Sequence, residues 1–117
     1  MRIYPTILML ALMGALGLAA SVAPALAEDP EFTEDYLNNP ENIELGHTLF
    51  KQQCNKCHGK GAYPGKAPKL KPRKISAEDI YLRITYGWRK MPPWEEVYTD
   101  EERMALTAYL KSPIFSN

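Results

Sequence analysis

The chain has 117 residues, and its 14 basic residues balance its 14 acidic ones, so the net formal charge at pH 7 is zero. This balance gives the protein no general affinity for nucleic acid or for an anionic membrane. The length suits one small domain, and the sequence contains no internal repeat and no low-complexity tract.

Residues 1–27 are predicted to be a signal peptide that is cleaved on export. Arg2 supplies positive charge, residues 7–20 are almost wholly apolar, and residues 25–27 form an A-x-A cleavage site. An uncleaved membrane anchor is the alternative, because apolar residues continue patchily through residues 3–27. After cleavage we expect a periplasmic protein of about 90 residues, with no stable membrane insertion.

Residues 28–40 are predicted to be an acidic N-terminal extension. Acids occur throughout residues 28–44, without any lysine or arginine. Its acidic part, residues 28–35, could be a docking segment or simply disordered.

A first helix is predicted to begin after Asn39 and to continue to Cys54. Asn39 is a favoured N-cap residue, Pro40 fits the first helical turn, and Glu41 lies near the positive end of the helix dipole. Apolar and small residues then recur at helical spacing, at Ile43, Gly46, Leu49 and Phe50.

Two further helices follow, separated by irregular loops. Ser76 and Asp79 resemble a capping box that opens a helix through Tyr86, and Gly87 ends it. Residues 99–102 form a full capping box for a last helix that ends near residue 111. Residues 59–72 are rich in Gly, Pro and Lys, and no segment alternates well enough to predict a strand. The predicted fold class is therefore all-α.

The two cysteines of the chain lie in a C-x-x-C-H motif formed by Cys54, Cys57 and His58. This spacing is typical of c-type haem attachment. The two thiols can add to the two vinyl groups of one haem, and His58 is then placed as the proximal iron ligand. The motif predicts one covalent haem c, and we expect the chain without haem to be poorly folded.

Other uses of the motif are weaker. An exported C-x-x-C pair could form a structural or catalytic disulfide, but such a short loop stabilises little, and the βαβ pattern of a thioredoxin-like protein is missing from the sequence. A zinc site would have to add His47 to the motif, whose three contiguous ligands suit a tetrahedron poorly.

The second axial position of the iron requires another ligand. Met104 lies in the middle of the last helix, where methionine usually packs, and His47 is expected to be solvated. Met91 lies in the irregular segment 87–94, where Pro92 restricts it to an extended conformation and Pro93 stiffens the turn. Met91 is the predicted ligand; the alternative is that Met91 only packs and the sixth position is open.

With these residues the chain resembles a class I cytochrome c of the small bacterial kind, over residues 43–110. The resemblance rests on features that occur in order: Gly46 and Phe50, the C-x-x-C-H motif, Ala67-Pro68-Lys69-Leu70, Met91-Pro92, and Leu106, Tyr109 and Leu110. It implies a cytochrome c fold of three to four helices wrapped around one covalently bound haem, formed by residues 41–112 and followed by a short tail at residues 113–117.

The resemblance also implies how the haem is surrounded. The Pro68 carbonyl would accept the ring N–H of the proximal histidine, and Tyr109 of the last helix would cross the first helix at Gly46, where the two backbones can approach closely. Trp88 and Trp94 bracket the methionine loop. Either could pack on the haem edge or donate its indole N–H to a propionate, or it could simply pack within the loop.

The function implied is that of a periplasmic one-electron carrier rather than an enzyme, since both axial positions of a six-coordinate His/Met haem are occupied by the protein. It would carry electrons between a dehydrogenase or respiratory complex and a terminal acceptor. One alternative is a cytochrome subunit or dedicated acceptor of a periplasmic dehydrogenase, for example a quinoprotein alcohol dehydrogenase. Another is a haem enzyme or gas sensor in which the Met91 ligand is labile.

Charges are segregated along the chain. Residues 51–74 contain eight basic residues and no acid, Arg89 and Lys90 lie beside Met91, and residues 95–102 are acidic again. Positive charge around the haem edge would attract redox partners with acidic docking surfaces. The protein is expected to be a monomer or a subunit of a dehydrogenase complex.

Overall fold

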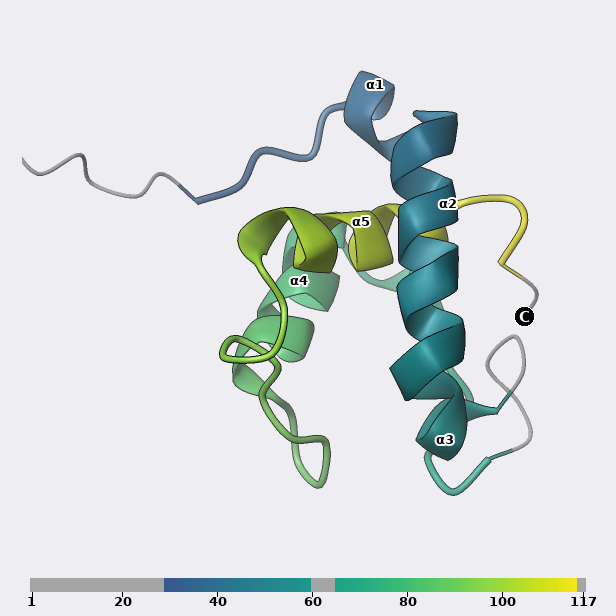
Figure 1. Ribbon diagram of the computed structural model, residues 1–117, viewed down its shortest axis with the longest axis vertical. Helices are drawn as coiled ribbons and strands as arrows, with labels where there is room; N and C mark the ends of the chain where they lie inside the picture. The colour runs from purple at the N-terminus through teal and green to yellow at the C-terminus, as the bar shows by residue number, and fades with distance from the viewer. Residues whose placement is uncertain (1–28, 60–64, 116–117) are drawn as a thin grey trace, which may run out of the picture.

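The computed structural model describes residues 29–59 and 65–115, so the predicted signal peptide lies outside the described residues (Figure 1). The helical elements are α1 (Glu34–Leu37), α2 (Pro40–Leu49), η1 (Phe50–Cys54), α3 (Asn55–His58), η3 (Pro72–Lys74), α4 (Ala77–Tyr86) and α5 (Asp100–Lys111). The described chain contains no strand beyond an isolated bridge between Trp88 and Met91. The prediction of an all-α fold is confirmed. No helix in this part of the chain is long and apolar enough to cross a membrane.

The predicted helix starts are present, and side chains cap them. The Asn39 carboxamide oxygen accepts a hydrogen bond from the Glu41 amide at 2.8 Å, and the Ser76 hydroxyl accepts one from the Asp79 amide at 3.1 Å. At α5, Thr99 and Glu102 form the complete reciprocal capping box, with distances of 3.2 and 2.9 Å. Each cap satisfies backbone donors that the first helical turn leaves unpaired.

The first predicted helix differs from a simple α-helix. It is α-helical as far as Leu49, continues as the π-helix η1 and returns to α-helical geometry in α3, without a break in the ribbon (Figure 1). A π-helical turn contains an extra residue and changes the direction of the side chains after it. Here the segment ends at Cys54, so it sets the direction of the first cysteine of the motif.

Residues 32–37 of the acidic extension are folded against the domain. Thr33 caps α1 by accepting a hydrogen bond from the Tyr36 amide at 3.2 Å, and α1 contacts α5. The Phe32 ring lies 5.8 Å from the Tyr81 ring of α4. The first helix of the structure is therefore α1, inside the segment that the sequence presents as an extension.

Helices α2 and α5 cross at Gly46, as expected. A Cβ atom at Gly46 would lie 2.0 Å from the Ala105 carbonyl oxygen and 2.8 Å from the Tyr109 Cβ atom. Only glycine allows this approach, and the predicted pairing of Gly46 with Tyr109 is confirmed. In Figure 1, α5 crosses α2 at a steep angle.

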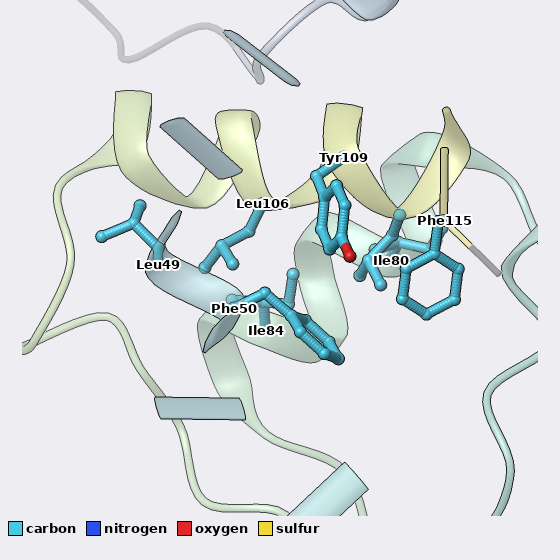
Figure 2. Close-up of a cluster of buried hydrophobic side chains, with 8 residues drawn as sticks. Leu49, Phe50, Ile80, Ile84, Leu106, Tyr109 and Phe115 are labelled. Atoms are coloured by element: carbon cyan, nitrogen blue, oxygen red, sulfur yellow. The ribbon is translucent and has the colours of Figure 1, made fainter. Parts of the chain in front are cut away.

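The core forms where α2, α4 and α5 meet (Figure 2). Its buried members are Leu49, Phe50, Ile80, Ile84, Leu106, Tyr109, Leu110 and Phe115. The Phe115 ring lies 5.6 Å from that of Phe50 and 5.3 Å from that of Tyr109. Phe115 is only 1% exposed, so the predicted tail at residues 113–117 contributes a core side chain.

One buried charge joins α4 to α5. Arg103 is 4% exposed, forms an ion pair with Asp100, and holds its guanidinium 5.4 Å from the Tyr81 ring. The Tyr81 hydroxyl donates to the same Asp100 carboxylate at 3.1 Å. This network satisfies part of the guanidinium and fixes the two helices side by side.

Candidate metal centre

The C-x-x-C-H motif occupies the end of η1 and the short helix α3. Cys54 and Cys57 are three residues apart on a helix, so their thiols face the same side. Cys54 packs against the hydrophobic core, whereas Cys57 is exposed, and both are free thiols. Burial raises the pKa of the Cys54 thiol to about 11, so this group is protonated at neutral pH. The motif presents two neighbouring thiols at one edge of the core.

His58 follows directly and has an unusual environment. Its Nδ1 atom is buried and has no hydrogen-bond partner of good geometry. Burial lowers the pKa of His58, while the neighbouring Pro68 carbonyl acts in the opposite direction. A half-buried imidazole whose pKa is lowered is neutral at pH 7, which is the form that binds a metal ion.

The loop after the motif folds back onto it. The Ala67 amide donates to the Cys57 carbonyl at 2.8 Å, and a Cβ atom at Gly65 would lie 2.1 Å from that same oxygen. This close return places Pro68 beside the His58 ring. Leu70 then packs against the core, although sequence reasoning did not single it out as a site residue.

The methionine loop is irregular, as predicted, and contains a tight turn at residues 88–91. Trp88 and Met91 exchange two backbone hydrogen bonds of 3.1 and 3.0 Å around the residues 89–90. The loop is attached to the end of α4, because the Trp94 amide donates to the Ile84 carbonyl at 3.0 Å. Gly87 has a φ of 75°, and a Cβ atom there would lie 2.6 Å from the Met91 carbonyl oxygen. The backbone of Met91 is thus fixed by the turn before it and by the attachment of Trp94 to α4 after it.

Several predicted site residues meet at one core. Cys54, Met91 and Trp94 all pack, partly buried, against the same hydrophobic cluster. In Figure 1, the loop that follows α4 and the helix α3 project from the same side of α5. Tyr98, which sequence reasoning missed, packs there too, with its ring 5.9 Å from that of Trp94. The position of Tyr98 directly before the capping box could have indicated that its ring packs against the domain.

The remaining candidates are placed elsewhere. Trp88 is 46% exposed, unlike the half-buried Trp94. His47 is half-buried: its ring stacks on Tyr109 with a distance of 4.9 Å between ring centroids, and its side chain remains 32% exposed, so it is solvated in part. Met104 is half-buried on α5. Within residues 29–59 and 65–115, no three His, Cys, Asp or Glu side chains group as ligands for a metal ion.

These residues fit a c-type haem. Two thiols on one helical face match the two vinyl groups. The buried Nδ1 atom of His58 lies beside the Pro68 carbonyl, which suits a proximal histidine that this carbonyl orients while the other ring nitrogen is left for the iron. The partly buried thioether of Met91 lies against the same core as Cys54.

Solved c-type cytochromes share this fold. Cytochrome CL from the marine methylotrophic bacterium Methylophaga aminisulfidivorans MPT has a TM-score of 0.59 and 23% identity, covering 74% of this chain and 70% of its own. The KustC0563 c-type cytochrome has a TM-score of 0.54 and 30% identity, covering 62% of this chain and 98% of its own. The c-type cytochrome NirC has a TM-score of 0.53 and 25% identity, covering 68% and 99%. The fold and the site define a c-type cytochrome of class I with one covalently bound haem c.

A match to a family model shows the family of this chain. Residues 41–110 match the family model described as cytochrome c oxidase, cbb3-type, subunit III, and the chain belongs to this family. It is also 29% identical over 98 residues to the Cbb3-type cytochrome c oxidase subunit FixP of Sinorhizobium medicae (strain WSM419). That match covers 68% of this chain and 34% of FixP, so the chain spans about a third of its curated relative.

Proposed function

We propose that this protein is an exported one-electron carrier, with haem c attached through Cys54 and Cys57 and ligated by His58 and Met91. Membership of the cytochrome family implies the electron-carrying role. The observation that supports the ligand set most strongly is that Cys54, at the end of η1 in the same motif as His58, and Met91, in the loop after α4, pack against one core.

The haem, when bound, supplies the reversible one-electron chemistry of its iron. The chain holds and shields it. Pro68 orients the His58 imidazole, and the turn at residues 88–91 keeps the thioether from moving away. Because His58 and Met91 would both hold the iron, a substrate would have no direct access to it, and we propose a carrier rather than an enzyme.

The protein would act in the periplasm, after the predicted signal peptide has been removed. We propose that its partners are redox proteins with acidic docking surfaces. A second arrangement, in which the chain is the cytochrome subunit of a larger complex, is supported by the match to the cbb3-type subunit III family. In both arrangements the site performs the same electron transfer.

Replacing Met91 with alanine tests the proposed ligand set. We expect the low-spin absorption spectrum of the oxidised protein to be lost and the reduction potential to fall by on the order of 100 mV, because the thioether favours the reduced iron. Carbon monoxide should bind the reduced variant rapidly, and the reduced wild-type protein slowly.

Met104→Ala is the matched control, since Met104 is half-buried on α5. It should keep the low-spin spectrum and the potential of the wild type. A low-spin spectrum retained in Met91→Ala would contradict the ligand set. Rapid binding of carbon monoxide by the wild type would instead favour a gas sensor or haem enzyme.

A further inference from the structure

We propose that the protein docks its electron-transfer partner on an arginine–tryptophan platform formed by Arg83, Trp88 and Arg89, and that the partner is a redox protein presenting carboxylates. This inference rests on the proposed electron-carrying function. It places docking at the methionine loop and not at the lysine-rich segment that follows the cysteine motif.

The platform is built around an exposed indole. Trp88 is 46% exposed, and the guanidinium carbons of Arg83 and Arg89 lie 4.6 and 4.2 Å from its ring centroid. Arg83 comes from the last turn of α4 and Arg89 from the turn that follows. Two separate elements therefore bring positive charge to one aromatic ring at the protein surface.

The charges of the platform have no carboxylate partner among the described residues, where the ion pairs are those of His47 with Glu44 and of Arg103 with Asp100. A guanidinium that stacks on an aromatic ring keeps its in-plane N–H donors free and loses little entropy when they bind. Those donors match the two oxygens of a carboxylate. Tryptophan and arginine are also enriched among the residues that contribute most of the binding energy at protein interfaces.

The backbone holds Arg89 in place at a conformational cost. Arg89 has a φ of 55°, which only glycine adopts easily, and it is the one non-glycine residue of the described chain with positive φ. Such strain is found where a surrounding structure imposes it, often at functional sites. Here the two backbone hydrogen bonds between Trp88 and Met91 impose the turn, so the platform is directly tied to the proposed iron ligand.

The lysine-rich segment offers a weaker alternative. Lys69, Lys71, Arg73 and Lys74 line a hollow of about 230 Å³ at η3. No aromatic ring lines this hollow, and lysine ammonium groups are strongly hydrated point charges on flexible stems. The segment therefore attracts anions at long range but lacks the pre-organised donors of the platform.

The test measures how fast the oxidised holoprotein is reduced by the iron(II)–EDTA complex, an anionic one-electron reductant covered with carboxylates. The complex gives one electron to the haem iron and becomes iron(III)–EDTA. At an ionic strength of about 10 mM, we expect Arg83→Gln/Arg89→Gln to lower the second-order rate about fivefold, and Lys71→Gln/Arg73→Gln, which removes equal charge, to change it less than about twofold. Cationic hexaammineruthenium(II) should reduce the arginine variant faster than the wild type.

Two variants of Trp88 distinguish an effect of the stacked arginines from an effect of positive charge alone. Trp88→Phe retains a stacking ring and should keep a rate close to wild type, whereas Trp88→Ala retains both arginines and should slow iron(II)–EDTA about twofold or more. An unchanged low-spin spectrum establishes that each variant keeps its haem and ligands.

The proposed platform would be contradicted if Lys71→Gln/Arg73→Gln slowed reduction by iron(II)–EDTA as much as the arginine variant or more. It would also be contradicted if the arginine variant were reduced at the wild-type rate. The carrier function would survive either result, because a separate outcome of this experiment contradicts it: a wild-type haem that neither reductant reduces reversibly.

Discussion

Replacing both Cys54 and Cys57 with serine is expected to abolish covalent haem binding and to leave a largely unfolded chain. The core cluster has eight buried side chains, and Cys54, Met91 and Trp94 are only partly buried against it. A domain this small buries little apolar surface of its own. The haem would supply the apolar surface that these side chains need, and its ligation adds binding energy to folding energy. Without it, folding must meet the full conformational entropy of long loops.

Far-ultraviolet circular dichroism of the purified double variant measures this effect. We expect at least about half of the helical signal of the holoprotein to be lost at 25 °C. Each single variant keeps one thiol that can still anchor the haem, and should retain most of the fold. Wild-type chain produced without haem should resemble the double variant, and a fully folded wild-type apoprotein would contradict the proposed dependence on haem.

Gly46→Ala is expected to destabilise the holoprotein by about 3 kcal/mol, although alanine is the better helix former. The gain in helix propensity is at most about 1 kcal/mol. Against it, the new Cβ atom would lie 2.0 Å from the Ala105 carbonyl oxygen, which belongs to the backbone and has no rotamer through which to yield. The helices α2 and α5 must therefore separate, which disturbs Tyr109 and the core beneath it.

Denaturant unfolding followed by haem absorbance gives the free energy of unfolding for this comparison. Glu44→Ala, on an exposed position of the same helix, serves as the control and should change stability by less than about 0.5 kcal/mol. If Gly46→Ala proved as stable as this control, the close crossing of α2 and α5 would be incorrect.

Local sequence signals predicted the framework well. Asn39, Ser76 and Thr99 cap the helices that they were expected to cap, because capping depends on residues within one helical turn. The crossing at Gly46 and the position of Pro68 beside His58 followed from the family resemblance. These features depend on short motifs that a sequence contains in full.

Features that depend on contacts between distant segments were missed. The packing of Phe32 on Tyr81 and the burial of Phe115 are decided by the faces of α4 and α5, which no local pattern reveals. The contact between the His47 ring and Tyr109 of α5 was missed for the same reason, although the His47 side chain stays 32% exposed. The π-helical turn before Cys54 has no sequence signal of its own.

The most direct test of the central claim is an absorption spectrum of the purified mature wild-type protein, recorded oxidised, reduced and as its alkaline pyridine adduct, before and after extraction with acidified acetone. We predict one haem per chain that stays with the polypeptide through extraction, because two thioether bonds hold it, and a low-spin spectrum in both oxidation states. A polypeptide that is colourless after extraction, or that never contained haem, would contradict the account of Cys54, Cys57 and His58.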